Sequence, residues 1–350
     1  MNVFRRPFFT KLFNWEYWSF GMIYNWIYPV WIFLCIRARS FFFFAAANPV
    51  IRNGGFLNES KKDIYAMMPD DLYPRTAFFS TGDQPGYVWE QLSREEFSFP
   101  MIGKPDVGGR GRGIKILKSR EDIFAYTEAA VVDFHIQEFV SFPLEAGIFY
   151  YRMPGQETGV LSGIVRKEFL TVVGDGRRTV RELLQTNSRQ MIYLAKLEAM
   201  YGSALNRVIP DGQKELLVPI GNHARGAKFL DDSHLIDAQL TTVIDRICRE
   251  LPEFYFGRLD IRYNSWEDLK EGKNFVVIEV NGAGSEPTHI YDPRHSLFFA
   301  WKEIIRHWII LWKISRINHR LGHRYLSVWE GIEMFREDTA HSTLLKKMPE

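Results

Sequence analysis

Two segments late in the chain carry side chains that could hold a divalent cation next to a phosphate. The run FVVIEVN at 275–281 has an apolar, β-branched centre, which predicts a buried strand, and GRLDIRY at 257–263 predicts a neighbouring one. Glu279 and Asn281 are two residues apart, so on a strand they project from one face, and Asp260 stands on the other strand. Carboxylate and amide oxygens suit Mg²⁺ bound to phosphates. A solvated strand face is the alternative interpretation.

A glycine-rich segment lies upstream, directly after an apolar stretch that ends at Lys104. Glycine fills four of its six positions, namely Gly108, Gly109, Gly111 and Gly113. Successive backbone N–H groups in such a loop form an anion site, and Arg110 and Arg112 add positive charge. No Gly-Lys-Ser/Thr follows and the next element reads as a strand, which excludes a Walker A loop and the dinucleotide fingerprint. The alternative is an ordinary β-hairpin turn.

A third candidate element is the strand-like segment HIQEFVSF at 135–142. Its end combines the Glu138 carboxylate with the backbone groups of Phe139 and Val140. A carboxylate and free backbone groups at a strand end can hydrogen-bond an adenine amino group and a ring nitrogen. Taken alone, this segment indicates nothing, because many strands end in mixed residues.

In this order the three elements resemble the ATP-grasp superfamily, most closely its D-alanine–D-alanine ligase-like branch of carboxylate–amine ligases. The resemblance covers roughly Ser60 to Pro293 and implies an α+β ATP-grasp fold with two lobes enclosing the nucleotide. For ATP it implies Lys104 on the α- and β-phosphates, a lid from Gly108 to Gly113, an adenine hinge at Glu138, Phe139 and Val140, Glu145 on the ribose, and Lys61 or Lys62 as an earlier phosphate lysine. For the reaction it implies metal ligands Asp260, Glu279 and Asn281, with Arg258 stabilising charge on the substrate. The lysine pair equally suits a solvated surface.

The resemblance implies ATP together with Mg²⁺ or Mn²⁺ as cofactors. A ligase of this kind transfers the γ-phosphoryl group to a carboxylate, and an amine then displaces phosphate from the acyl phosphate. Such a reaction needs positioning and charge stabilisation more than covalent help, so lysine, arginine, metal and backbone amides are suitable groups. We see no convincing Ser/His/Asp or Cys/His arrangement in the sequence.

The substrate side departs from the D-alanine–D-alanine ligase pattern. After Asn281 that family continues Thr-x-Pro-Gly-Met, whereas this chain reads GAGSEPTH. Candidate substrate contacts are Lys167, the backbone N–H groups of Gly282 and Gly284, and the side chains of Glu286, Thr288 and His289. A structural role for His289 and a solvated strand end for Lys167 remain alternatives.

Composition indicates a folded enzyme of a reducing compartment. The chain has 350 residues, and 44 basic against 42 acidic side chains give no bias toward nucleic acid. Its two cysteines, Cys35 and Cys248, are too few for a disulfide framework or a structural zinc site. We therefore expect a cytoplasmic protein. The resemblance implies that its partners are an amino acid or other carboxylate and an amine acceptor.

The two ends of the chain are rich in aromatic residues. No charged residue occurs from Tyr17 to Cys35, but Pro29 interrupts the run and aromatic side chains dominate it. The segment from Trp301 to Arg320 has a basic stripe and a broad apolar face, the pattern of a helix in a membrane interface. We expect peripheral attachment to the cytoplasmic face of a membrane. The alternatives are that the ends pack together as core, or that one of them spans the bilayer.

These observations predict four regions and one principal function. The regions are an aromatic segment at 1–58, a small lobe with the lid at 59–140, a large lobe with the metal site at 141–293, and a basic amphipathic helix with a polar tail at 294–350. The predicted function is an ATP- and Mg²⁺-dependent carboxylate–amine ligase that forms a peptide or amide bond with an amino acid. An ATP-grasp kinase or phosphotransferase is one alternative, and a non-catalytic, membrane-associated ATP-binding scaffold is another.

Overall fold

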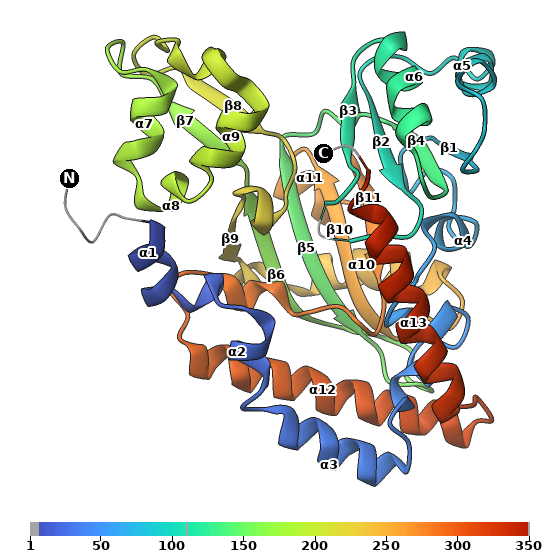
Figure 1. The fold of residues 1–350 in the computed structure, drawn as a ribbon. Coiled ribbons are helices and arrows are strands. Elements are labelled where there is room, and N and C mark those ends of the chain that lie inside the picture. The colour runs from blue at the N-terminus through green and yellow to red at the C-terminus, as the bar shows by residue number, and fades with distance from the viewer. Residues whose placement is uncertain (1–6, 110, 349–350) are drawn as a thin grey trace.

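The α+β fold class predicted from the sequence is confirmed. The computed structural model describes residues 7–109 and 111–348, so the predicted lid residue Arg110 lies outside the described part of the chain. Within that part, one antiparallel sheet forms a small lobe and a larger antiparallel sheet forms the centre of the molecule. Long helices cover the side opposite the small lobe (Figure 1).

The small lobe is a four-stranded antiparallel sheet with two helices on one face. Its strands run in the order β1-β4-β2-β3. Their bounds are β1 (Thr76–Phe79), β2 (Met101–Pro105), β3 (Lys115–Leu117) and β4 (Phe134–Glu138), and the helices are α5 (Pro85–Arg94) and α6 (Arg120–Ala129). Strands β2 and β3 pair as a hairpin, and the glycine-rich segment is the connection between them. Lys104 is the next-to-last residue of β2.

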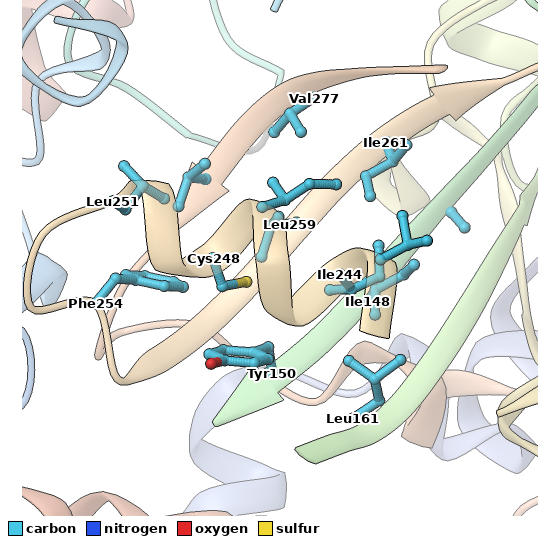
Figure 2. Packing of buried hydrophobic residues seen from close by; sticks show 14 of the residues in the cluster. Ile148, Tyr150, Leu161, Ile244, Cys248, Leu251, Phe254, Leu259, Ile261 and Val277 are labelled. Atoms are coloured by element: carbon cyan, nitrogen blue, oxygen red, sulfur yellow. The ribbon is translucent and has the colours of Figure 1, made fainter. Parts of the chain in front are cut away.

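The large lobe is a five-stranded antiparallel sheet in the order β11-β10-β5-β6-β9. Its elements are β5 (Leu144–Tyr151), β6 (Val160–Glu168), β9 (Lys228–Asp231), β10 (Phe256–Tyr263), β11 (Phe275–Asn281), and helices α4 (Lys61–Tyr65), α10 (Ala238–Glu250) and α11 (Trp266–Lys270). Helix α10 repeats apolar residues every three or four positions, so one face is apolar. Figure 2 shows that face, with Ile244 and Cys248, packed on Ile148 of β5 and Leu259 of β10. Helix α4 adds Ile64 to the same core.

A third group of elements stands beside the large sheet and has a small core of its own. It consists of the hairpin-like pair β7 (Leu170–Val173) and β8 (Lys214–Val218) with helices α7 (Val180–Thr186), α8 (Ser188–Met191) and α9 (Leu194–Tyr201). Its apolar side chains, such as Val180, Leu184 and Leu197, form a separate buried cluster. We call this group the side lobe; it faces the small lobe across the upper part of the molecule (Figure 1).

The two aromatic ends of the chain pack against each other. The N-terminal segment forms α1 (Pro7–Phe13), α2 (Phe20–Tyr24) and α3 (Tyr28–Ala38). Helices α2 and α3 run beside α12 (Leu297–Arg320), whereas α1 lies next to α8 (Figure 1). Ile304 and Leu311 of α12 are buried, and the Asn318 side chain donates a hydrogen bond of 2.9 Å to the carbonyl of Ala46. The apolar face of α12 therefore packs against the N-terminal segment. This is the mutual packing that the sequence analysis left open as an alternative. Within the described residues, no helix combines the length and the apolar composition needed to cross a bilayer.

The stretch predicted as a polar tail forms the helix α13 (Val328–Leu345). Ser327 and Glu330 form a capping box that satisfies the first free backbone N–H groups of the helix. Leu345 and Met348 are then buried in the core of the small lobe. The many polar residues of this stretch lie on the outer face of the helix. Its composition therefore did not indicate that the helix is amphipathic.

Candidate active site

A cavity of about 690 Å³ lies between the lobes, and most predicted site residues line it. The predicted residues on its wall are Lys61, Lys104, Gly108, Gly109, Gly111, Arg112, Glu138, Phe139, Val140, Glu145, Lys167, Arg258, Asp260, Glu279, Asn281, Glu286 and Thr288. The described residues Gly113, Gly282, Gly284 and His289 are not on that wall. Residues predicted from six separate segments therefore meet at one place.

The predicted metal ligands are brought together by the register of two strands. Asp260 of β10 is directly opposite Glu279 of β11, and Arg258 is directly opposite Asn281. Because side chains two apart on a strand share a face, all four project toward the cavity. The sequence prediction of two adjacent strands carrying this set is confirmed by that pairing.

Basic side chains neutralise this acidic set in the structure. Asp260 accepts hydrogen bonds from Arg258 at 2.9 Å and lies 3.0 Å from the Lys167 ammonium group. Burial raises the pKa of Asp260, but these two cations hold it below its ordinary value. Glu279 lies 3.3 Å from Lys61. The lowered pKa favours the charged form of Asp260, which can accept a metal cation.

The donor set fits Mg²⁺ that is also bound to phosphate. No group of three His, Cys, Asp or Glu side chains among residues 7–109 and 111–348 could hold a metal, so the protein offers two carboxylates and one amide. The buried amide nitrogen of Asn281 has no hydrogen-bond partner among the described residues. Since amide oxygen and nitrogen exchange places when the group is turned over, that position can hold an oxygen ligand instead. Two or three protein oxygens leave room for phosphate oxygens and water around Mg²⁺.

Two lysines stand where phosphates would lie. The ammonium group of Lys104 is buried and donates to the carbonyl of Ile278 at 3.2 Å and to the Tyr65 hydroxyl at 3.4 Å. Burial, with a contribution from the nearby Lys61 charge, lowers the pKa of Lys104 to about 7. Lys61 donates to the carbonyls of Asp106 and Gly108 at 3.3 Å. A phosphate would give the buried Lys104 an anionic partner and would lie beside Lys61, which already pairs with Glu279.

The glycine-rich lid is held from two sides. Gly111 and Gly113 have φ values of 72° and 67°, which residues other than glycine rarely adopt. Arg225, in a short turn beside the side lobe, donates to the Gly111 carbonyl at 2.7 Å. On the other side, His341 of α13 donates to the Val107 carbonyl at 2.7 Å. The lid therefore lies folded over the cavity and contacts both the side lobe and the C-terminal helix.

The predicted hinge and ribose residues connect the lobes. Glu138 ends β4, and Phe139 and Val140 lie between β4 and β5. The Glu138 carboxylate pairs with Arg75 at 2.8 Å. Glu145 is buried between Lys167 and Arg262, at 2.9 and 3.0 Å. That carboxylate fixes two cations in the cavity wall.

The predicted glycine donors after Asn281 are used inside the protein. The Gly282 N–H donates to Glu59 at 3.1 Å, and the Gly284 N–H donates to the Gly55 carbonyl at 2.8 Å. Burial raises the pKa of Glu59 to about 7. His289 is also buried, 3.6 Å from Glu303 of α12. These contacts attach the segment before α4 and helix α12 to the substrate side of the sheet.

The cavity also has a wall that the sequence analysis did not predict. Trp18, Phe20 and Ile23 of the N-terminal segment line it. The buried Glu16 fastens this segment to the side lobe, accepting from Arg189 at 2.8 Å and from His223 at 3.2 Å. An uncharged aromatic run suits a cavity wall as well as a membrane interface. Glu16, the one acidic residue from 7 to 58, was the sequence feature that indicated packing on protein.

Comparisons with known proteins bear on the fold. No family model and no curated protein matches the sequence. The structure is similar to D-alanine–D-alanine ligase from Bacillus anthracis, with a TM-score of 0.42 and 11% identity over 75% of this chain and 69% of that one. It is similar to a bifunctional glutathione synthetase from Pasteurella multocida, with a TM-score of 0.38 and 16% identity over 71% of this chain. The matched part is 34% of the synthetase, so this chain spans about a third of its length.

A third similar structure is the ATP-grasp ligase PsnB, with a TM-score of 0.36 and 14% identity over 71% of this chain and 59% of that one. With identities and TM-scores this low, the chemistry of this chain has to be inferred from its own cleft.

Proposed function

We propose that this protein is an ATP- and Mg²⁺-dependent carboxylate–amine ligase that acts through an acyl phosphate. One observation carries the proposal: the opposed pairs Asp260–Glu279 and Arg258–Asn281 face a cavity that also contains the buried Lys104. Metal ligands, a phosphate lysine and an arginine for the reacting oxygens thus meet at one place. These are the groups that phosphoryl transfer to a carboxylate needs.

Each residue has a physical role in this proposal. Mg²⁺, held by Asp260, Glu279 and Asn281, would neutralise charge on the phosphates. Lys104 and Lys61 bind phosphate oxygens, and Arg258 holds the substrate carboxylate and the charge that develops on it. The Arg258 guanidinium also donates to the Glu286 carbonyl at 3.2 Å, which fixes its direction. The lid excludes water, which would otherwise hydrolyse the acyl phosphate.

The test is ADP and phosphate release by the purified protein with Mg-ATP across a panel of amino acids, dipeptides and small acids. Product masses are measured in the same reactions. ADP release that requires both an acid and an amine, with a condensation product, supports the ligase. A phosphorylated acid as the final product would instead identify a kinase. Tight Mg-ATP binding without turnover by any pair would favour a non-catalytic scaffold.

We further propose that the outer face of the N-terminal helices contacts a membrane surface with anionic lipids. The outward side chains of α3 include Phe33 and Ile36, 58% and 69% exposed, and the preceding Trp26 is 76% exposed. Exposed apolar residues recurring at helical spacing on the solvent side are unusual for a water-facing helix. Lys11, Arg37 and Arg39 are basic, whereas the one acid from 7 to 58, Glu16, is buried.

Flotation with phosphatidylcholine vesicles, with and without phosphatidylglycerol, tests this surface. The full-length protein should float with the anionic vesicles, and the double change Phe33→Glu with Ile36→Glu should abolish flotation. The control replaces two exposed apolar residues of the side lobe, Met200→Glu with Leu216→Glu. Equal flotation of both variants, or none of the unmodified protein, would contradict the proposal.

A further inference from the structure

The acidic side chains that line the cavity differ in how they are neutralised. Five of the six are in ion pairs with a lysine or arginine, namely Glu16, Glu138, Glu145, Asp260 and Glu279. The sixth is Glu286, for which no lysine, arginine or histidine of the described residues lies within ion-pair distance. A lone carboxylate in a cavity wall is costly unless water or a ligand supplies a donor. Glu286 therefore has capacity for a cationic partner.

Two phenol groups hold the Glu286 carboxylate in place. Tyr24 of α2 donates a hydrogen bond to its Oε1 atom, and the Tyr291 hydroxyl lies 3.3 Å from both oxygens. Burial, followed by the charge of Glu286, raises the pKa of Tyr24 well above its ordinary value, so the hydroxyl stays a donor. Two neutral donors orient a carboxylate without neutralising it. The carboxylate thus faces the cavity without a salt bridge to any described residue.

The position of Glu286 relates this charge to the proposed reaction centre. Its backbone carbonyl accepts from Arg258, the residue proposed to hold the reacting carboxylate. Trp18, Phe20 and Ile23 line the same cavity on the N-terminal side. A group bound by the Glu286 side chain would therefore lie next to the proposed acyl phosphate and be partly shielded from water. The acceptor amine of a ligase carries positive charge at neutral pH.

We propose that Glu286, held by Tyr24 and Tyr291, binds the protonated amine of the acceptor substrate. Tyr24 comes from the N-terminal segment, so this segment would complete the acceptor site as well as close the cavity. This inference rests on the proposed ligase function and adds the residue that selects the protonated acceptor. An ammonium group has no free electron pair, so it passes one proton to the Glu286 carboxylate before the neutral amine attacks the acyl carbon and phosphate leaves.

The experiment compares two small nucleophiles that differ in charge. Ammonium is a cation at pH 7.5, whereas hydroxylamine is neutral and gives a hydroxamate with an acyl phosphate. Both are supplied with Mg-ATP and the carboxylate that supports ADP release. Glu286→Gln should raise the KM for ammonium by about tenfold to a hundredfold, since a charge-assisted hydrogen bond is lost. Hydroxamate formation and the KM for ATP should change by no more than about twofold.

Tyr24→Phe provides a milder variant, because it removes one hydroxyl and keeps the ring that packs on Phe20. It should raise the KM for ammonium severalfold and leave hydroxamate formation unchanged. The matched controls are Tyr28→Phe, in the same segment, and Glu128→Gln, on the exposed face of α6. Neither should affect either nucleophile.

The outcomes separate this inference from the ligase proposal. If the unmodified protein forms neither amide nor hydroxamate with any carboxylate, the ligase proposal fails and the amine site fails with it. If it forms both, and Glu286→Gln slows them equally, Glu286 is structural and only the amine site is overturned. An unchanged KM for ammonium in Glu286→Gln would overturn it as well.

Discussion

The two halves of the cavity are built in different ways. In the nucleotide half, the side chains stand on paired strands, where Asp260 is opposite Glu279 and Lys104 lies on the neighbouring lobe's β2. In the substrate half, the wall comes from the N-terminal segment, which is attached through Glu16 and Tyr24 rather than by strand pairing. Strand register fixes positions within a fraction of an ångström, whereas a docked segment depends on a few side-chain contacts. We infer that phosphoryl transfer is the robust part of the site and substrate choice the adaptable part.

The two halves also differ in how their carboxylates are neutralised. In the nucleotide half, Lys61, Lys167 and Arg258 neutralise the carboxylates even without a ligand. In the substrate half, Glu286 is held by hydroxyl groups alone. Substitutions in the first half should therefore affect every reaction, and those in the second should affect particular substrates.

The largest expected effect is loss of all turnover from the double change Asp260→Asn with Glu279→Gln. Removing both proposed metal carboxylates should lower amide and hydroxamate formation together, by roughly a hundredfold or more. The measurement is ADP release with each nucleophile, and circular dichroism checks the fold. The control, Asp211→Asn with Glu250→Gln, changes the same residue types at exposed positions. Activity that survives the first pair would show that the metal assignment is wrong.

The next effect concerns pH and Lys104 in the nucleotide half. Because its pKa is lowered to about 7, most Lys104 is neutral at pH 8, and phosphate binding should raise that pKa again. Mg-ATP binding at pH 8 should therefore take up nearly one proton and weaken as pH rises further. Calorimetry in two buffers of different ionisation enthalpy measures that uptake. Lys104→Met should remove it, whereas Lys118→Met, at an exposed position, should not.

The same pKa has a consequence for stability that gives a second check. Between about pH 7 and the ordinary lysine pKa of about 10.4, unfolded Lys104 binds a proton that native Lys104 does not. The free energy of unfolding should therefore rise with pH across this interval. A stability that is flat there in the unmodified protein, or that rises equally in Lys104→Met, would contradict the lowered pKa.

The sequence predicted the nucleotide half better than the substrate half. The strands carrying Asp260 and Glu279 were predictable because each has a short apolar run in which polar residues alternate. The cavity wall at Phe20 was not, because an uncharged aromatic segment can pack on protein or on lipid equally well. Helix α13 was not predictable either. Its buried Leu345, and Met348 just beyond its end, are dispersed among polar residues. What a segment packs against is a property of tertiary structure that local pattern does not contain.

A smaller effect is expected from Glu16, which attaches the N-terminal segment to the side lobe. Glu16→Gln leaves Arg189 without its anionic partner and should lower the free energy of unfolding by about 3 kcal/mol. Burial raises the pKa of Glu16, but His223 and Arg189 hold it below its ordinary value. The stabilisation is thus present above that ordinary pKa and lost as pH falls through the native one.

Urea denaturation at pH 7 and at pH 4 measures this contribution. The difference between the unmodified protein and Glu16→Gln should shrink at the lower pH, and Mg-ATP affinity should be nearly unchanged. The exposed control Glu128→Gln should show no difference at either pH. A parallel fall in Mg-ATP affinity would mean that the two halves are not separable in the way described above.

The smallest expected effect comes from the lid, where the two halves meet. Arg225 reaches the Gly111 carbonyl from the substrate side, whereas His341 reaches the Val107 carbonyl from α13. Arg225→Ala and His341→Ala should each raise the KM for ATP by only about two- to fivefold, since one hydrogen bond is lost. The two variants should differ in how tightly ADP release is coupled to amide formation. Only Arg225→Ala loosens the lid on the side where the acceptor enters, so it should increase ADP release without amide formation, measured as the ADP-to-product ratio. An equal ratio in both variants would show that the lid closes over the nucleotide without regard to the acceptor.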